Sequence, residues 1–580
     1  IGSISWADLA QVIMKSHTRL DGFILGSDAR PEYIFGVYVE GSSDNIVIQN
    51  NTIAGLYGQS TVAPDWENCA QRRNVGGNVI AICVGSGCSN VDISDNVVSS
   101  LGGGSAPTFH SNFEACDGGY AYGIYVRSGV DTCTITGNSL SNLRGGNGGD
   151  HVCSSCGNPG DGGDAWGIWI EGGQNVLVAG NTVSAGFGGD GGHGWSTAGG
   201  DTYSTPGDFK GISFTGSGNA DDNVIVDGSG GFPSGDSIGL ELDGDASAGS
   251  NTVKDLFGSD GWGSLTGGMA AGITISGLPV SPPVVQHNVI HNMNGGPPGD
   301  PGLHGGDARG IIAQAPSRLF NNLLFDITGG EQKEISDENA IGILAAGADI
   351  EVINNTVARV SMSAVSPSWS LAKGIDVTVD CAPCTVQNNI VADVTGIQEG
   401  IDGGGFGFDA EAEPTHSHNL SFGASHADYA IQFLQGATDI AEDPLFVTLD
   451  SRFALEFFLS QTGCGQSSDS PAFDSGSDPA SALLLDNRTT CTLLNLDDGT
   501  VDRGFHYPQD LEFGLPAIRR GDTLPGPLPV LIDSTMLPFT DPDPVFTNTY
   551  PPLLFYQVDA QVVIRLTKVE DASEFYVRLN

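Results

Sequence analysis

Four aspartates recur at one fixed position relative to a repeated glycine. Each lies three residues before a glycine that opens a short apolar stretch, and the four are Asp164, Asp208, Asp236 and Asp307. If these stretches stack as strands about 4.8 Å apart, the carboxylates form a column and repel one another unless something compensates. Ca²⁺ would do so, as a cation that prefers oxygen ligands, and so would backbone amides if each aspartate closes its own turn. No EF-hand loop or calcium-binding nonapeptide array is present, so the turn is favoured and calcium is the alternative.

Lys210 is the basic residue with the best neighbours for catalysis. It lies one residue before its repeat glycine, and Asp208, Glu241 and Asp243 fall within one repeat of it. Lys210, Glu241 and Asp243 are therefore the candidate catalytic group of an elimination reaction on an acidic polysaccharide, which needs a base. With 22 basic residues against 69 acidic ones, no multi-residue basic site builds up around them. Scattered, solvated charge is the favoured interpretation.

Two aromatic residues are predicted to stack on the outer side of the repeats. Tyr125 and Trp169 lie two residues past their glycines, and Arg127 and Glu171 follow two residues later. An exposed aromatic stack beside an Arg–Glu pair suits a platform for a sugar ring, or a contact with a loop or another subunit. We expect an interface of one of these kinds.

The cysteines favour disulfide bonds over metal ligation. The candidates are Cys381 and Cys384, Cys83 and Cys88, Cys464 and Cys491, and the loop set Cys69, Cys116, Cys153 and Cys156. Cys133 lies at an inward strand position and is expected to be a buried free thiol. The loop set has the atoms for a Cys₄ zinc site but lacks two matched CxxC pairs. Haem attachment is excluded because glycine, and not histidine, follows Cys156.

Composition excludes several classes of partner. The 580 residues carry a net charge of −47, whereas binding to nucleic acid or anionic membranes needs clustered Lys and Arg. No apolar run approaches the roughly 18 residues of a transmembrane segment. The glycine-rich string 228–235 opens a strand and not a helix, so it offers no nucleotide phosphate site. The cysteines indicate an oxidising compartment, and the start at Ile1 without a signal peptide indicates a longer precursor.

A repeat runs through most of the chain and must position these residues. Its first half is a short strand after a small residue, as in GIYVR (123–127), and its second half resembles NVLVAGNTV (175–183). Apolar and polar residues alternate in both halves, which indicates β-strands with one buried face. The units recur at intervals of about 26 to 45 residues and differ in their loops, which is typical of a solenoid.

Two further columns are expected from the repeat. One is a stack of asparagines that adopt the left-handed turn conformation and bond to one another, namely Asn51, Asn96, Asn138, Asn181, Asn322, Asn355 and Asn389. The coil 216–253 is expected to be irregular, because its segment 223–230 does not fit the asparagine pattern. The other is one glycine-rich, acidic face formed by stacked loops at 99–120, 145–167, 184–208 and 291–307.

Over about residues 19–440 the chain resembles the right-handed parallel β-helix proteins, the superfamily that contains pectate lyases. This resemblance implies an all-β solenoid of about ten or more coils, and it is weak for function because the superfamily includes lyases, hydrolases, adhesins and proteins without chemistry. Residues 442–508 resemble the terminal segment of secreted choice-of-anchor proteins. We therefore expect a β-helix at 1–440, terminal coils and a cap at 441–510, and a proline-rich linker with a small β-domain or docking hairpin at 511–580.

The function favoured by the sequence is an extracellular or cell-surface structural or adhesive protein without catalytic activity. Its expected partners are further copies of itself or a cell-surface polysaccharide. A polysaccharide lyase acting on an acidic polysaccharide and a calcium-dependent carbohydrate-binding module are the alternatives.

Overall fold

The computed structural model describes the chain in several stretches separated by gaps. They are residues 10–26, 33–58, 60, 76–107, 115–152, 159–196, 200–262, 265–299, 304–331, 339–363, 371–396, 404–430, 432–448, 455–509, 564–567 and 576–579. The chain forms two compact units. The first comprises Ile1–Pro444, Ser475–Ser477 and Arg503–Phe505, and the second comprises Leu445–Asp474, Asp478–Asp502 and His506–Asn580.

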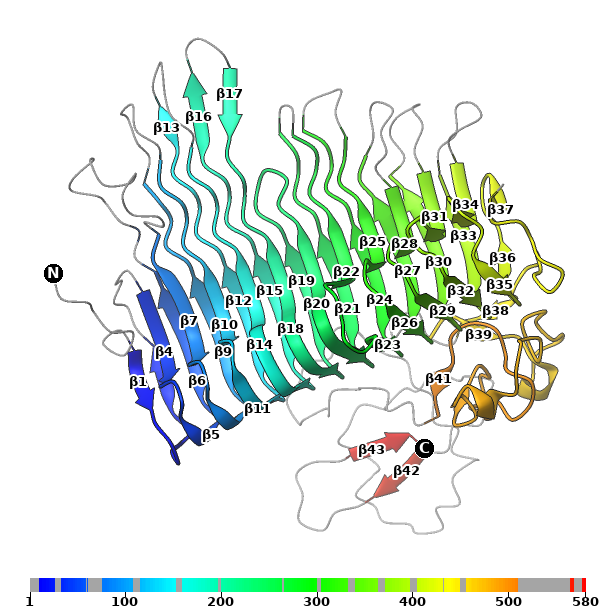
Figure 1. Cartoon of the computed structure of the whole chain (residues 1–580), viewed down its shortest axis with the longest axis horizontal. Coiled ribbons are helices and arrows are strands. Elements are labelled where there is room, and N and C mark those ends of the chain that lie inside the picture. The colour runs from blue at the N-terminus through cyan, green and yellow to red at the C-terminus, as the bar shows by residue number, and fades with distance from the viewer. Residues whose placement is uncertain are drawn as a thin grey trace, which may run out of the picture. The chain divides into compact units, whose positions relative to one another are not determined.

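The first unit is a parallel β-helix, in which every coil pairs in parallel with the next (Figure 1). Its first face contains β1 (Ala10–Met14), β4 (Tyr33–Val39), β7 (Asn78–Val84), β10 (Ala121–Val126), β14 (Ala165–Ala179), β18 (Phe209–Asp221), β20 (Ser237–Gly249), β22 (Ala270–Ser276), β25 (Ala308–Ala313), β28 (Asn339–Ala345), β31 (Leu371–Val377), β34 (Gly404–Ala410) and β37 (Ala427–Tyr429). The all-β solenoid predicted from the repeat is confirmed.

Two further faces complete each coil. The second face contains β2 (Arg19–Asp21), β5 (Asp44–Gln49), β8 (Ser89–Ser94), β11 (Val130–Thr136), the later halves of β14, β18 and β20, then β23 (Val284–Gln286), β26 (Ser317–Phe320), β29 (Ile350–Ile353), β32 (Cys384–Gln387) and β35 (Thr415–Ser417). The third face contains β3 (Ile24–Gly26), β6 (Thr52–Tyr57), β9 (Val97–Gly102), β12 (Ser139–Arg144), β15 (Thr182–Phe187), β19 (Val224–Ser229), β21 (Thr252–Phe257), β24 (Val289–Asn294), β27 (Leu323–Gly329), β30 (Thr356–Met362), β33 (Ile390–Thr395) and β36 (Leu420–Phe422). The coil 216–253, expected to be irregular, is so on one side only: β18 and β20 pair residue by residue along their length, whereas the pairing of β14 with β18 shifts register around Gly216 and Gly218.

The core explains the repeated Gly-Ile pair of the first face. The residue after each glycine points inward and is fully buried, as in Ile124, Ile168, Ile212, Leu240, Ile273, Ile311, Ile343, Ile375 and Phe408. The glycine itself faces a third-face side chain at close range: a Cβ on Gly167 would lie 2.6 Å from a methyl carbon of Val183. Glycine at this position therefore lets the first and third faces pack against each other.

A buried asparagine ladder runs between the second and third faces. Its members are Asn51, Asn96, Asn138, Asn181, Asn223, Asn251, Asn288, Asn322, Asn355, Asn389 and Asn419. The predicted stack is confirmed, but the expectation that segment 223–230 does not fit the asparagine pattern is wrong, because Asn223 is a member of the ladder. The residue in the left-handed conformation is the one before each asparagine, such as Asp222 at φ 56° and Ser250 at φ 55°.

The loops between the third and first faces stack as a second hydrogen-bonded structure, which we call the glycine layer. Its members are Gly77, Gly104, Gly119, Gly146, Gly163, Gly189, Gly207, Gly231, Gly235, Ser259, Gly268, Gly296, Gly306 and Gly330, and each N–H donates to the carbonyl of the preceding member at 2.7–3.1 Å. The bonds alternate between limbs that leave the third face and limbs that return to the first face. The stacking expected for these loops is thus confirmed for their described residues. Beyond this layer, β13 (His151–Val152), β16 (His193–Ser196) and β17 (Gly200–Tyr203) form a small sheet.

Two short segments from late in the chain belong to the β-helix unit. Arg503 donates to the carbonyl oxygens of Asn419 at 2.8 Å and Thr438 at 3.1 Å. Ser477 donates its N–H to Asn388 Oδ1 at 3.0 Å. These bonds attach the two segments to the last coils of the β-helix, beside the asparagine ladder.

The second unit is built from short elements without further coils in its described residues. They are β38 (Phe446–Val447), β39 (Phe458–Leu459), the 3₁₀ turns η3 (Thr462–Cys464) and η4 (Ala480–Ala482), β40 (Arg488–Thr489), β41 (Tyr507–Pro508), β42 (Ile564–Thr567) and β43 (Tyr576–Leu579). β42 and β43 form an antiparallel hairpin. The proline-rich linker predicted near 524–531 lies outside the described residues.

Candidate functional site

The outer side of the first face carries a stacked aromatic cluster. Tyr122 lies on Trp166 with ring centroids 4.7 Å apart, and Tyr125 lies on Trp169 at 4.6 Å. Adjacent coils place these rings one strand spacing apart, which is close to the distance for stacking. The predicted Tyr125–Trp169 stack is present, but its expected exposure is wrong for Tyr125, because Tyr122 and Trp166 pack beside it and leave it 8% exposed.

Tyr125 is held by a carboxylate. Its Oη donates to Glu171 Oε2 at 2.7 Å, and burial together with this bond raises the pKa of the Tyr125 hydroxyl. The predicted pair between Arg127 and Glu171 stays a prediction. Since most of this aromatic surface is covered by its own members, it offers a sugar ring little open area.

Lys210 and Glu241 form a direct ion pair. Lys210 Nζ donates to Glu241 Oε1 at 3.0 Å and Oε2 at 3.1 Å, and Ser213 Oγ donates to Oε2 at 2.7 Å. Asp243 lies two residues further along β20, one strand position past the pair. The pair therefore links two neighbouring coils through a charge-assisted contact.

A second cationic cluster occurs on the same face near its C-terminal end. Lys373 Nζ lies 2.9 Å from Asp376 Oδ2 and 2.9 Å from Asp409 Oδ2. Burial raises the pKa of Asp376 and its lysine partner opposes the shift, while the two carboxylates raise the pKa of Lys373 against burial. This cluster could have been predicted from the sequence, because Asp376 and Asp409 occupy the same repeat position as Trp169 and Glu241.

Three of the four predicted calcium-site aspartates bond to the next coil. Asp164 Oδ1 accepts the N–H of Asp208 at 2.8 Å, Asp208 Oδ1 accepts that of Asp236 at 3.0 Å, and Asp236 Oδ1 accepts that of Met269 at 2.7 Å. Asp307 pairs with the guanidinium of Arg309. Amides therefore compensate the carboxylates, as the favoured interpretation held, but they belong to the next coil and not to the same turn. Calcium at this column stays a prediction.

The aspartate column predicts an unusual pH dependence. Burial, with smaller contributions from Asp208 and Asp307, raises the pKa of Asp236 from 3.8 to about 6. A raised pKa means that the folded state holds the proton more tightly, so this stability is present below pH 3.8 and is lost as the pH rises through about 6. Asp236→Asn keeps the acceptor oxygen for Met269, and it should stabilise the protein at pH 8 by up to about 3 kcal/mol while leaving it unchanged at pH 4.

Thermal unfolding of Asp236→Asn at the two pH values measures this effect, with the exposed Asp131→Asn as control. Equal destabilisation at both pH values would contradict it. If calcium occupies the column, chelator should lower the melting temperature of the unmodified protein at pH 8, and the substitution should abolish that sensitivity.

Two predicted disulfides are confirmed and one is wrong. Cys381 is bonded to Cys384 and Cys464 to Cys491. Cys83 and Cys88 are free, because Cys83 faces outward into the aromatic cluster whereas Cys88 faces the core. Cys133 is the expected buried free thiol, and burial raises its pKa to about 12.

The loop cysteines are described in part. Cys116 is disulfide-bonded. Its fellow candidates Cys69, Cys153 and Cys156 lie outside the described residues. The alternative of a zinc site formed by all four loop cysteines therefore stays untested.

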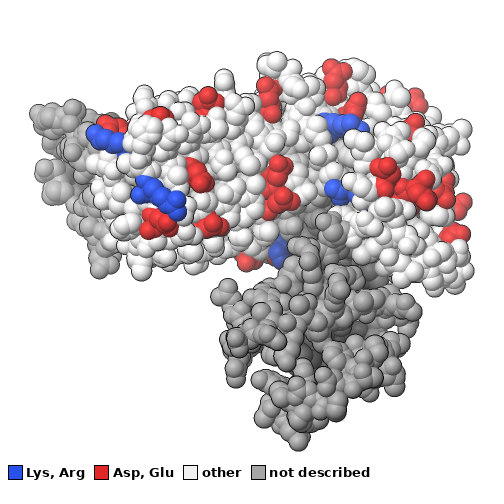
Figure 2. All heavy atoms as spheres, turned by 90° about the horizontal axis from the view of Figure 1, so that it is seen from below, with Lys and Arg blue, Asp and Glu red and all other residues white. Residues whose placement is uncertain are grey.

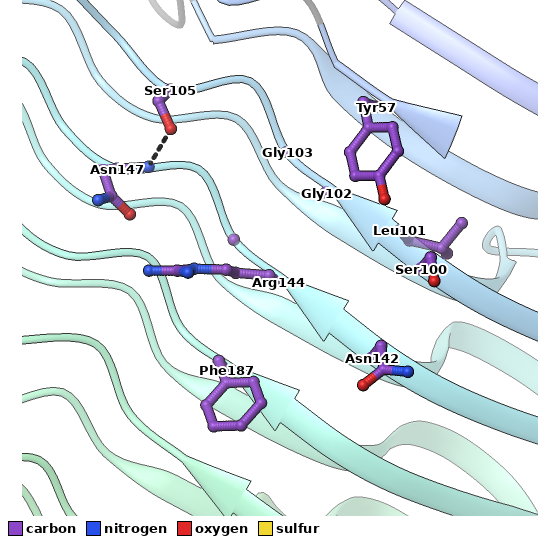
Figure 3. Close-up of a pocket in the computed structure, with 11 residues that line it drawn as sticks. Tyr57, Ser100, Leu101, Gly102, Gly103, Ser105, Asn142, Arg144, Asn147 and Phe187 are labelled. Carbon is purple, nitrogen blue, oxygen red and sulfur yellow. Dashed lines mark hydrogen bonds between the residues drawn. The ribbon is translucent and has the colours of Figure 1, made fainter. Parts of the chain in front are cut away.

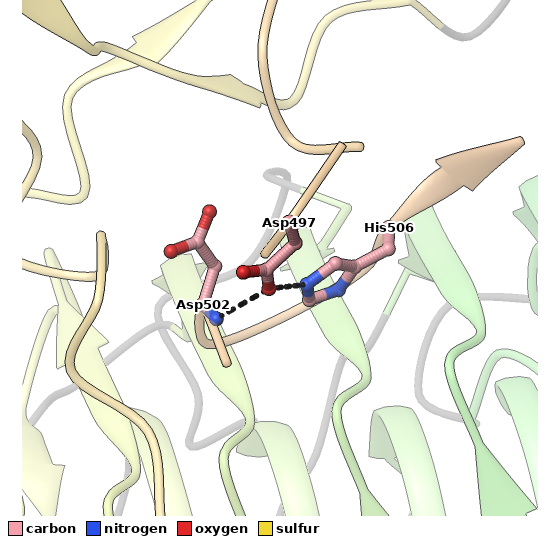
Figure 4. A group of neighbouring side chains, drawn as sticks. All are labelled: Asp497, Asp502 and His506. Atoms are coloured by element: carbon pink, nitrogen blue, oxygen red, sulfur yellow. Dashed lines mark hydrogen bonds and ion pairs between the residues drawn. The ribbon is translucent and has the colours of Figure 1, made fainter. Parts of the chain in front are cut away.

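A buried group of titratable side chains in the second unit was not predicted from the sequence. Among the described residues, Asp497, Asp502 and His506 are the set whose ligand atoms all lie within 4.8 Å of one another (Figure 4). His506 Nε2 lies 2.9 Å from Asp497 Oδ2, and burial beside Asp497 raises the pKa of Asp502 to about 7. The set has the donor types for a metal ion, but hydrogen bonds from the Asp474 N–H and the Thr490 hydroxyl already hold Asp502. It is best explained as a structural network.

A groove of about 490 Å³ lies on the outer side of the third face, where β6, β9, β12 and β15 end (Figure 3). Its lining includes Tyr57, Arg144 and Phe187 together with glycines at 102, 103 and 145. Ser105, Asn142 and Asn147 add hydroxyl and amide groups. None of these residues was a candidate in the sequence, because the columns of the third face were used only to establish the fold.

Charge on the surface agrees with the composition. Figure 2 shows acidic side chains spread over one face of the molecule with few Lys or Arg among them. None of the described residues forms a helix long and apolar enough to cross a membrane.

The stacked faces and ladder define a parallel β-helix protein. No family model and no curated protein matches the chain. Among solved structures it is similar to the crystal structure of pectate lyase Pel9A, with 13% sequence identity over 79% of this chain and 88% of that chain and a TM-score of 0.32. A likeness of this size carries no argument about activity, and the fold rests on the strand pairing itself.

Proposed function

We propose that this protein is an extracellular, non-catalytic β-helix that serves as a structural or adhesive scaffold at a cell surface. The observation that carries the proposal is the glycine layer. Its amide-to-carbonyl bonds join the described loops of successive coils from Gly77 to Gly330. Loops tied together in this way form a rigid surface for display and are poorly suited to close over a substrate.

Two further observations support a scaffold. The cations of the first face at Lys210 and Lys373 are paired with carboxylates. Disulfides at Cys381–Cys384 and Cys464–Cys491 favour an oxidising, extracellular location. We propose that its partners are other copies of the chain or a polysaccharide of the cell surface.

Electron microscopy of the negatively stained native protein, with calcium and then with chelator, tests the structural role. Filaments, sheets or binding to isolated cell-wall material support it. Discrete particles that bind no surface material in either condition overturn it. Parallel incubation with acidic and neutral polysaccharides should give no unsaturated sugar product and no new reducing ends.

A polysaccharide lyase is the second candidate, on the strength of the Lys210–Glu241 pair. We expect Lys210→Ala to change no polysaccharide-degrading activity and to lower stability by about 1–2 kcal/mol, because Glu241 loses its partner in a half-buried setting. Lys254→Ala is the matched control, since Lys254 is more exposed than Lys210 and lies 3.9 Å from its partner Asp255. An unsaturated product formed by the native protein and lost in Lys210→Ala would make the protein a lyase.

A further inference from the structure

An exposed aromatic track runs along the third face, through the groove and beyond it. The column of paired positions reads Tyr57, Gly102, Arg144, Phe187, Ser229 and Phe257. Its rings are exposed to 48% at Tyr57, 44% at Phe187 and 42% at Phe257. Exposed aromatic rings that are grouped on one face indicate an interaction surface, whereas single exposed rings scattered over a protein do not.

Small residues separate the rings of the track. Gly102 lies between Tyr57 and Arg144, and the Tyr57 ring packs over it, because a Cβ there would come within 2.9 Å of that ring. Ser229 separates Phe187 from Phe257. Five strand spacings of about 4.8 Å give the track a length of roughly 24 Å, which suits a linear chain of several rings.

The local charge of the track is balanced. Of the described residues that line the groove, Arg144 alone is charged, and its guanidinium lies 3.6 Å from Asp190 Oδ2. The chain as a whole carries −47. A polyanion would therefore meet overall repulsion without a free cationic anchor.

The edges of the strands are not available to a peptide. β9, β12 and β15 each pair with a neighbour on both sides, so an extended peptide cannot add to the sheet there. The polar groups in reach are the exposed Asn142 amide, the Ser105 hydroxyl and Arg144, whose side chain is 60% exposed. Together they offer donors and acceptors, and sugar hydroxyls need both.

We propose that this track binds a neutral, linear polysaccharide, with its sugar rings packed on Tyr57, Phe187 and Phe257 and its hydroxyls bonded to Asn142 and Arg144. The inference rests on the proposed adhesive function, because it names the surface and the ligand class of that adhesion.

Titration calorimetry on the full chain tests the track with cellohexaose, xylohexaose, mannohexaose and hexagalacturonate as probes. We expect at least one neutral hexasaccharide to bind with an affinity that is insensitive to NaCl. Phe187→Ala should weaken it about tenfold, and Tyr57→Ala combined with Phe187→Ala should abolish it. Phe422→Ala, which removes a ring exposed to 38% on the same face but outside the track, should leave it unchanged.

Three results would overturn the inference. They are no binding to any neutral hexasaccharide, binding unchanged in the double variant, and salt-sensitive binding to hexagalacturonate alone. The two proposals fail separately. A neutral glycan that is bound and cleaved removes the non-catalytic scaffold but leaves the track, whereas surface assembly without glycan binding removes the track and leaves the scaffold.

Discussion

Gly163→Ala should destabilise the β-helix by about 3 kcal/mol, although the new side chain is a single methyl group. A Cβ on Gly163 would lie 2.1 Å from the carbonyl oxygen of Gly119 and 2.6 Å from its carbonyl carbon. Both atoms belong to the backbone of the glycine layer and cannot turn aside as a side chain can. The clash with the new methyl group can therefore be removed only if the neighbouring coils move apart. The small entropic benefit of alanine in the unfolded chain, about 0.4–1 kcal/mol, offsets little of this cost.

Denaturant unfolding followed by circular dichroism measures the effect. Gly463→Ala is the control, because no atom lies within 4 Å of the methyl group it would add. We expect that variant to be as stable as the native protein or slightly more stable. A Gly163→Ala protein of native stability would show that the layer is loosely packed and would remove the main support for a rigid scaffold.

Asn181→Ala should cost about 3–5 kcal/mol, the range for a broken buried polar network. Asn181 Oδ1 accepts from the N–H and the side-chain amide of Asn138 at 3.0 and 2.9 Å. Its own amide donates to the Ile135 carbonyl at 2.8 Å and to Asn223 Oδ1 at 3.0 Å. All these partners are buried, and alanine leaves them without water to replace the lost bonds.

The matched control for the ladder is Asn175→Gly in the same coil. Asn175 is exposed, its amide donates to Asp131 Oδ1 at 3.1 Å, and its φ of 54° suits glycine, so the substitution should cost about 1 kcal/mol or less. Hydrogen exchange should locate the opening of Asn181→Ala in β11, β14 and the neighbouring coils. Similar losses in the two variants would mean that the buried ladder contributes no more than a surface bond.

The fold was predictable because it depends on periodicity. Alternation of apolar residues and the repeated Gly-Ile pair are visible in one sequence, and both reflect packing between adjacent coils. Asn223 was missed because the coil 216–253 has shorter loops than its neighbours, which obscured the alignment. Cys83 and Cys88 were paired wrongly because sequence spacing does not reveal that the two side chains face opposite sides of the chain.

The candidate site was less accessible for a physical reason. Outward columns such as Tyr125 and Trp169 could be aligned, but whether a ring is covered depends on its lateral neighbours, here Tyr122 and Trp166. The track at Tyr57, Phe187 and Phe257 could have been found by aligning the third face in the same way. The groove, however, is also lined by loop residues such as Ser105 and Asn147, and no sequence pattern shows where loop residues lie relative to a strand column.

The asparagine ladder gives the solenoid a direction. Each of its side-chain amides donates one N–H to the carbonyl oxygen of the next asparagine toward the C-terminus, so the amide dipoles add along the axis as peptide dipoles do in a helix. The last amide, on Asn419, meets Asp439, whose Oδ1 accepts the Asn419 N–H at 2.7 Å. A carboxylate has acceptors and no donor, so Asp439 both neutralises the positive end of this array and stops it from being passed to another coil.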